Sequence, residues 1–159
     1  MHYIDLSDKQ KRDAGERLGR ANIAVYSASY WYDEVPMVEH SIRFPIYSQL
    51  VTQVIEAAFK DHKELKIGIA KQGGWQKYGP AFLGELKKIP DKYHQENGEY
   101  REGDFFLVSA AKSGIQLADF YVGSIRDSHR NLNTAHDRIK HQVKTYTVYQ
   151  IPALDKKER

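Results

Sequence analysis

The stretch DFFLVSAAKSGIQLADFYVGSIR, residues 104–126, decides the fold class that the sequence predicts. Its first six residues contain the apolar run of residues 105–108 and have the length of a strand. Ser113 and Gln116 then have the spacing of a capping box, which predicts a helix that continues to about His129. A strand followed closely by a helix is one half of a βαβ unit, so the stretch favours an α/β fold.

The same alternation extends outward along the chain. A helix is predicted over residues 7–19, where Ser7 and Gln10 form a capping box. A second helix is predicted over residues 45–58, with Pro45 at its first position, and a third over residues 79–89, which opens at Gly79-Pro80. Strands are predicted at 22–29, 65–70, 104–109 and 143–151, a short helix at 131–142, and loops at 30–43 and 91–103. We therefore expect a single domain over residues 1–159, with a parallel sheet covered by helices.

Composition narrows the class of protein. The 159 residues are 41% hydrophobic and 28% charged, which suits one domain with its own core. The absence of cysteine excludes a disulfide framework, a thiol nucleophile and a Cys-based zinc site, and it fits a reducing compartment. No apolar run approaches the roughly 20 residues that span a bilayer, and no secretory signal is visible. We expect a cytoplasmic protein without a membrane partner.

Two features are compatible with nucleic-acid binding. The net charge is only +3, but the basic excess lies mainly from Arg126 onward. Such a run also suits a solvated face with a frayed tail. The aromatic triplet Tyr30–Tyr32 has the residue types that stack on bases, although such a cluster can equally pack against the domain or a partner.

One acidic residue stands out on the helix after residue 112. Its apolar face is predicted to consist of Ile115, Ala118, Val122 and Ile125. Asp119 lies at the border of that face, where a carboxylate costs free energy unless it is paired, hydrogen-bonded or bound to a metal. Gly123 and Ser124 leave little side-chain bulk one turn further on, so another backbone or a substrate can approach closely.

The bland alternatives for this helix remain open. Asp119 can simply bond Arg126 or an exposed donor. Gln116, one turn earlier, can do no more than close the capping box. Spacing alone does not choose between these roles and a functional one.

The run from Ser109 through Ile115-Gln-Leu-Ala-Asp-Phe120 resembles the C-terminal motif of the domain-of-unknown-function family DUF3800. In that family a serine-containing strand and a short turn precede a helix that begins with an apolar-Gln-apolar-Ala-Asp stretch. Residues 2–27 resemble an internal stretch of the family, in which a histidine and a Leu-Ser pair precede a helix and then a strand. The likeness is diffuse over the whole chain and moderately specific at 115–119.

The resemblance implies a ribonuclease H-like, three-layer fold and metal-dependent cleavage of nucleic acid. Such sites hold two divalent cations, Mg²⁺ or Mn²⁺, between several carboxylates, and the metals activate water and stabilise the leaving oxygen. By this resemblance Asp119 is the catalytic residue and a metal ligand. Three further residues are candidates for substrate positioning or phosphate contact: Gln116, Ser109 and Lys112.

The chain departs from the family pattern at its other acidic positions. Residues 1–7 match the later His…Leu-Ser element better than the family's opening Asp-Glu-Ser-Gly strand, so we expect the opening strands to be absent. Lys71 follows the strand near whose end a second acid is expected, while Glu102 and Asp104 have no supporting pattern. The incomplete carboxylate set speaks against catalysis by this chain alone.

These departures leave several hypotheses. The chain can be a truncated member, a degenerate member, or one whose site a partner chain completes. A sheet without its first strands exposes an edge, which predicts a homo-oligomer or a completing partner. The rival interpretations are a non-catalytic module that binds nucleic acid or protein, and an inactive fragment.

Overall fold

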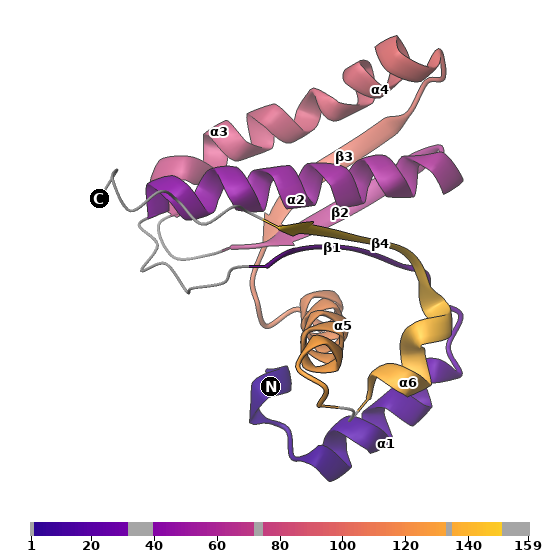
Figure 1. The fold of residues 1–159 in the computed structure, drawn as a ribbon. Coiled ribbons are helices and arrows are strands. Elements are labelled where there is room, and N and C mark those ends of the chain that lie inside the picture. Colours follow the sequence, from indigo (N-terminus) through magenta and orange to yellow (C-terminus); the bar gives the residue numbers. More distant parts are fainter. Residues whose placement is uncertain (1, 32–39, 72–74, 133–134, 151–159) are drawn as a thin grey trace. The chain divides into compact units, whose positions relative to one another are not determined.

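A computed structural model of the chain describes residues 2–31, 40–71, 75–132 and 135–150, and it confirms the α/β class (Figure 1). The helices are α1 (Asp8–Gly19), α2 (His40–Asp61), α3 (Trp75–Lys87), α4 (Ile89–Asn97), α5 (Ser113–His129) and α6 (His136–Ile139), with 3₁₀ turns η1 (Tyr3–Asp5) and η2 (Lys140–Gln142). The strands are β1 (Val25–Trp31), β2 (Glu64–Ala70), β3 (Glu102–Val108) and β4 (Val143–Gln150).

The described strands form two small sheets, β1 with β4 and β2 with β3. At one end of the second sheet the Glu102 amide donates to the carbonyl of Lys63 over 2.9 Å. At the other end the Lys71 amide donates to the carbonyl of Val108 over 3.0 Å. Both strands therefore run in the same direction, and α3 and α4 form the crossover between them. The predicted parallel βαβ connection is confirmed for this pair.

The chain forms two compact units, which we describe separately. Unit 1 comprises Met1–Tyr26, Gly68–Lys71 and Phe106–Lys144, and it contains α1, α5, α6 and the two 3₁₀ turns. Unit 2 comprises Ser27–Ile67, Gln72–Phe105 and Thr145–Arg159, and it contains α2, α3 and α4.

Unit 2 is built around aromatic side chains. Its three helices pack against one another, and Phe59, Phe82 and Leu86 have no exposed surface. The apolar stripe that the sequence predicts for α2 consists of Ile46, Tyr47, Leu50, Val51, Val54, Ile55 and Ala58. Of these, Ile55 is buried in the core, and Phe59, which was not part of the predicted stripe, is buried beside it. Arg101 joins the segment before β3 to α2, because its Nε donates to the carbonyl of Phe59 over 2.6 Å.

Two proline positions differ from the prediction. Pro45 and Pro80 were expected to open α2 and α3, yet both lie inside the helices, which begin five residues earlier. Each proline is the sixth residue of its helix, beyond the first four N–H groups that have no partner there, so it removes one hydrogen bond of the helix. Aromatic packing supports the added turns, because Phe44 stacks on Tyr78 with ring centroids 5.1 Å apart.

The polar segment after Pro90 also differs from the prediction. Residues 91–103 were expected to form a loop, but α4 occupies the segment up to Asn97. Pro90 is tolerated in its first turn, and Ile89 and Tyr93 supply a buried face at helical spacing. Gly98, with φ of 72°, then ends the helix in a left-handed conformation.

Other element boundaries shift less. The loop expected at 30–43 is shorter, because β1 continues to Trp31 and α2 begins at His40; residues 32–39 lie outside the described part. The predicted helices at 7–19 and 113–129 are confirmed, as is the Ser7–Gln10 capping box. The second capping box was wrong: Lys112, not Ser113, is the N-cap residue of α5, and its side chain makes no capping bond.

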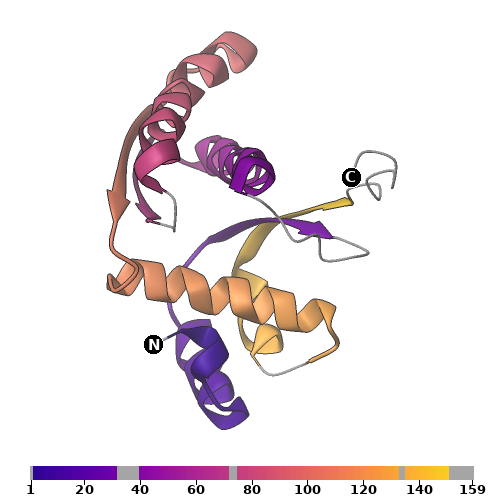
Figure 2. The same cartoon turned by 90° about the vertical axis from the view of Figure 1, so that its left-hand side faces the viewer.

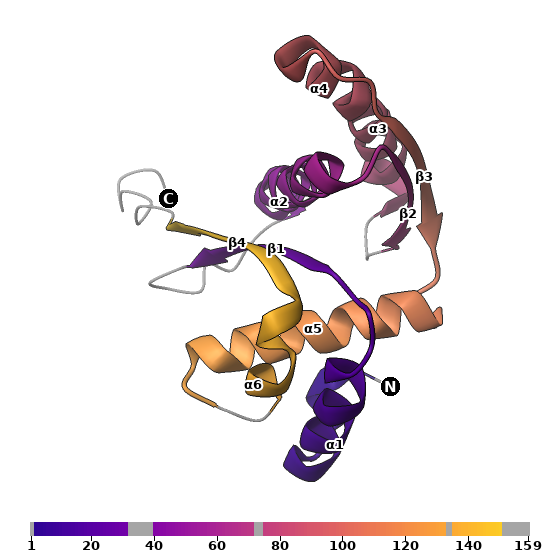
Figure 3. The same ribbon diagram turned by 90° about the vertical axis from the view of Figure 1, so that its right-hand side faces the viewer.

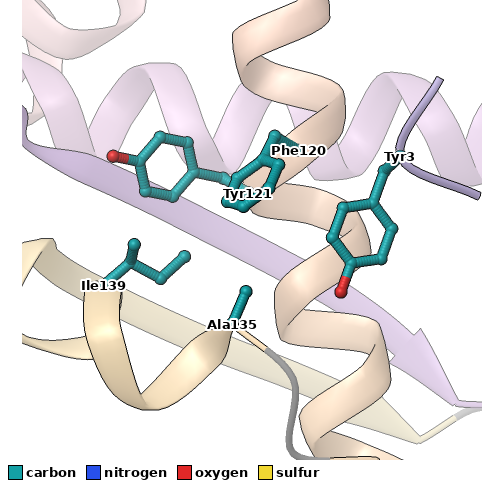
Figure 4. Packing of buried hydrophobic residues seen from close by; sticks show 5 residues of the cluster. All are labelled: Tyr3, Phe120, Tyr121, Ala135 and Ile139. Atoms are coloured by element: carbon teal, nitrogen blue, oxygen red, sulfur yellow. The ribbon is translucent and has the colours of Figure 1, made fainter. Parts of the chain in front are cut away.

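Unit 1 packs α1 against α6 and places α5 beside both η1 and α6 (Figures 2 and 3). Its core consists of five buried residues from η1, α5 and α6 with its N-cap, drawn in Figure 4: Tyr3, Phe120, Tyr121, Ala135 and Ile139. The apolar face predicted for α5 is only partly buried: Ile125 is buried and Ile115 is half-buried, but Ala118 is exposed and Val122 retains 65% of its surface. Phe120 and Tyr121 join Ile125 on the buried side, because they remove more apolar area from water.

Candidate functional site

The structure places two of the predicted site residues, Gln116 and Asp119, in α5, Lys112 at its N-cap and Ser109 just before it. Lys112, Gln116 and Asp119 follow one another at helical spacing, and Ser109 lies in the preceding turn, where its Oγ accepts from the Ala111 amide over 3.3 Å. The side chains of Ser109, Lys112 and Gln116 are exposed. In the described part of the chain, no hydrogen bond or ion pair joins any of these three to Asp119.

Asp119 binds the N-terminal segment of its own chain. Its Oδ2 accepts a hydrogen bond of 2.8 Å from the backbone amide of Tyr3, and the Nδ1 atom of His2 lies 3.6 Å away. The carboxylate therefore satisfies an amide at the start of η1, which has no partner within that turn. The Asp119 side chain is 39% exposed, so it remains accessible to solvent.

The side chain of Tyr3 lies along α5 over the two turns that follow Asp119. Its ring packs edge-on against Phe120, with centroids 5.3 Å apart, and lies directly over Gly123. A methyl group at Gly123 would overlap the ring. The hydroxyl then donates to Oδ2 of Asp127 over 2.8 Å. Asp119, Gly123 and Asp127, spaced four residues apart, thus hold one tyrosine; we call this set the Tyr3 clamp.

The far end of the Tyr3 clamp is a buried ionic group. Asp127 is only 5% exposed, and Lys11 Nζ lies 3.4 Å from its Oδ2 and 4.4 Å from the centre of the Tyr3 ring. Arg126 approaches the other carboxylate oxygen at 3.6 Å. A carboxylate removed from water in this way needs such donors, so Asp127 is tied to the packing of α1 on α5.

A second polar contact closes the other side of the core. Gln142 is 4% exposed; its amide nitrogen donates to the carbonyls of Leu18 and Ala21 over 2.7 and 2.8 Å. Its Oε1 accepts from the Tyr121 hydroxyl over 2.7 Å, and burial raises the pKa of that phenol. The side chain therefore joins the end of α1 to α5 with all of these groups satisfied.

The residues around Asp119 do not fit a site for two divalent cations. Mg²⁺ and Mn²⁺ prefer several oxygen ligands, chiefly carboxylates. Within the ranges that the structure describes, no group of three or more His, Asp or Glu side chains could hold a metal ion. The other residues considered, Glu102, Asp104 and Lys71, are exposed. The role of Asp119 as a catalytic residue and metal ligand stays a prediction.

Charge is divided unequally between the two units. The described part of unit 1 has five exposed acidic residues and eleven exposed basic residues. The acids are Asp5, Asp8, Asp13, Glu16 and Asp137. The basic residues are Lys9, Arg12, Arg17, Arg20, Lys71, Lys112, Arg126, Arg130, Arg138, Lys140 and Lys144. In the described part of unit 2 the exposed charges nearly balance, with seven lysines against eight acids: Lys60, Lys63, Lys66, Lys77, Lys87, Lys88 and Lys92; Asp61, Glu64, Glu85, Asp91, Glu96, Glu99, Glu102 and Asp104.

Comparison with known proteins gives no relative: no family model, no curated protein and no solved structure matches the chain. Among the helices of the described residues, none has the length and apolarity that crossing a membrane requires.

Three residues that organise the site were not singled out by the sequence: Tyr3, Asp127 and Gln142. The spacing Asp119-x₃-Gly123-x₃-Asp127 was a visible signal, because it aligns two acids with a glycine on one helix face. The small residue at Gly123 does permit a close approach, but the group that approaches is the side-chain ring of Tyr3, not another backbone or a substrate as predicted.

Proposed function

We propose that the protein binds nucleic acid through the exposed surface of unit 1 and does not cleave it. The observation that carries the proposal is the eleven-to-five excess of exposed basic over acidic residues on that unit. A basic surface attracts the phosphate backbone and releases its counterions on binding. A location in the cytoplasm belongs to the same proposal.

The Tyr3 clamp supports this interpretation. Asp119 and Asp127 are the two acids of α5, and both are engaged with η1 or α1. Neither is one of the five exposed acids of unit 1, because Asp127 is buried and Asp119 is partly buried. The exposed basic residues Arg126 and Arg130 follow on the same helix.

A basic cluster near the end of α1 is the part of this surface that we expect to contact phosphate. His141 lies against the carbonyl of Gly19 at 2.9 Å, which brings η2 beside the C-terminus of α1. Arg17 and Arg20 are exposed there, and no ion pair of either lies within the described residues. Arg138 is also exposed, but Glu16 lies 3.6 Å from it.

Fluorescence anisotropy with labelled single- and double-stranded oligonucleotides tests the proposal. Binding should weaken steeply with salt, and log Kd should change linearly with log salt concentration. The double variant Arg17→Gln/Arg20→Gln should lower the magnitude of that slope by about 2, because each lost phosphate contact removes about 1.

The matched control is Lys60→Gln/Lys87→Gln, which removes two exposed basic residues from the last turns of α2 and α3 in unit 2. It should leave both affinity and slope unchanged. Equal losses in the two double variants, or no salt-dependent binding by the wild type, would overturn the proposal.

A second candidate is the ribonuclease H-like nuclease, and the resemblance of residues 115–119 to the DUF3800 motif favours it. This candidate requires Mg²⁺ or Mn²⁺ and further carboxylates from a partner chain. Addition of either cation should then shift the NMR signals of Asp119, and Asp119→Asn should abolish cleavage. If the Asp119 signals do not shift while the protein still binds oligonucleotides, the nuclease candidate is excluded and only the non-catalytic binding function is left.

A further inference from the structure

Helix α5 has apolar residues on two adjoining sides. One side is buried in unit 1 and includes Phe120, Tyr121 and Ile125. The other presents Ile115, Ala118 and Val122, which share a side of the helix at i, i+3 and i+7. Val122 is 65% exposed, Ala118 is exposed, and Ile115 is half-buried. We call these three residues the α5 patch.

The α5 patch is unusual for the solvent side of a helix. A helix that is apolar all round is normally covered on every side. The neighbouring segment adds to the apolar surface, because Ile4 of η1 is 71% exposed and η1 packs on α5. Apolar residues gathered on one face, rather than scattered singly, mark a surface for association.

Charges of opposite sign flank the centre of the α5 patch. Asp119 lies three residues before Val122 and Arg126 four residues after it, so all three share one helix face. The two charged side chains are 39% and 44% exposed. Asp119 uses Oδ2 for the Tyr3 amide, and no contact in the described ranges uses its Oδ1.

This arrangement is complementary to itself. An interface with two-fold symmetry joins the same patch on both copies, so a residue and its partner exchange roles across the axis. When two α5 helices lie antiparallel and cross at Val122, each Arg126 faces the Asp119 of the other copy. Ile115 and Ala118, which precede Asp119, then lie beyond the charged pairs and face the C-terminal turns of the other α5.

We infer that the α5 patch is the interface of a homodimer in which two copies of α5 pack antiparallel across a two-fold axis near Val122. Dimerisation covers the apolar residues of the α5 patch and gives Asp119 an arginine partner, while its Oδ2 keeps the hydrogen bond to the Tyr3 amide. The inference does not depend on nucleic-acid binding, because the interface and the basic cluster of α1 involve different residues.

Sedimentation equilibrium of the full chain, without nucleic acid, tests the inference. The wild type should dimerise, and Val122→Asp should raise the dimer Kd by at least about 30-fold, because it places a charge at the centre of the interface. Val122 is exposed, so thermal melting should show the variant folded. Arg126→Asp should also weaken the dimer, since it faces Asp119 with a like charge.

The control is Leu132→Asp, which makes the same kind of change at an apolar residue that is 52% exposed and lies beyond the end of α5. It should leave the dimer Kd unchanged. Asp119→Asn keeps an acceptor for the Tyr3 amide while removing the charge, so it should weaken the dimer with little loss of stability. A wild type that stays monomeric up to millimolar concentration, or a Val122→Asp variant that dimerises like the wild type, would overturn the inference.

Discussion

The contacts inside unit 1 differ in kind from the contacts inside unit 2. In unit 2 the aromatic rings of Phe44, Tyr47 and Phe82 pack on one another between α2 and α3, with centroids 5.6 to 5.7 Å apart. In unit 1 polar groups join segments that lie far apart in the sequence, as the bonds of Tyr3 to Asp119 and Asp127 show. Apolar packing has little directionality, whereas buried polar groups require particular partners.

The difference has a consequence for surface charge. Unit 1 uses Asp119 and Asp127 for its internal contacts, and its surface is left with an excess of basic residues. Unit 2 keeps its acids exposed and nearly balanced by lysine. The way in which unit 1 is held together therefore also favours its proposed role in binding a polyanion.

The largest effect is expected in the aromatic core of unit 2. Phe82→Ala removes a ring with no exposed surface that packs against Phe44 and Tyr47, and it should lower the free energy of unfolding by about 3–5 kcal/mol. Denaturant unfolding followed by circular dichroism measures the loss. Tyr100→Ala, at a ring that is 78% exposed, should cost about 1 kcal/mol or less. Equal costs would show that this core is not packed as described.

The next effect concerns the buried ionic group of unit 1. Asp127→Ala leaves Lys11, whose side chain is 13% exposed, without its carboxylate and should cost about 3 kcal/mol. Asp137→Ala removes an acid that is 52% exposed and should cost less than about 1 kcal/mol. Adding Lys11→Met to Asp127→Ala should recover part of the loss, and additive losses would argue against a buried pair.

These two regions also differ in how far the sequence predicted them. The apolar periodicity of α2 correctly identified Ile55 as part of a core, because helical spacing of large apolar residues is a local signal. The Tyr3 clamp could not be found in this way, since its residues lie 116 to 124 positions apart. Asp119 was correctly recognised as a carboxylate needing a partner, but local sequence could not identify the amide of Tyr3 as that partner.

The helix boundaries show the same limit. Proline and polar residues were interpreted locally, which placed the starts of α2 and α3 too late and missed α4. Contacts between distant rings, such as Phe44 with Tyr78, override such local preferences. The ribonuclease H-like arrangement and the metal site depend on the resemblance alone and stay predictions.

A smaller effect tests the Tyr3 clamp itself. Gly123→Ala drives a methyl group into the ring of Tyr3 and should cost about 1–3 kcal/mol. Gly114→Ala, also in α5 but with open space around the added methyl group, should be neutral or stabilising. The cost at Gly123 should shrink in a Tyr3→Ala background. A cost that is independent of Tyr3 would contradict the clamp.

The smallest effect is a dependence of stability on pH. Burial lowers the pKa of His136 below its usual value of 6.5, and this outweighs Asp137, which raises it. The unfolded chain then binds the proton more readily than the folded one, so the contribution to stability is complete above the unfolded pKa and is lost as pH falls through the folded pKa. Unfolding measured between about pH 8 and about pH 5 should show this loss, and His136→Gln should reduce it. An unchanged pH profile would remove His136 from the account.

The central claim is that unit 1, and not unit 2, presents the surface that binds nucleic acid. Protein-detected NMR of the ¹⁵N-labelled chain during titration with an oligonucleotide, without divalent cations, tests it most directly. We predict that the backbone amide signals of α1 and of the η2 segment around His141 shift progressively, while those of α3 and α4 stay in place. Shifts confined to α3 and α4, or no shifts at all, would contradict the account.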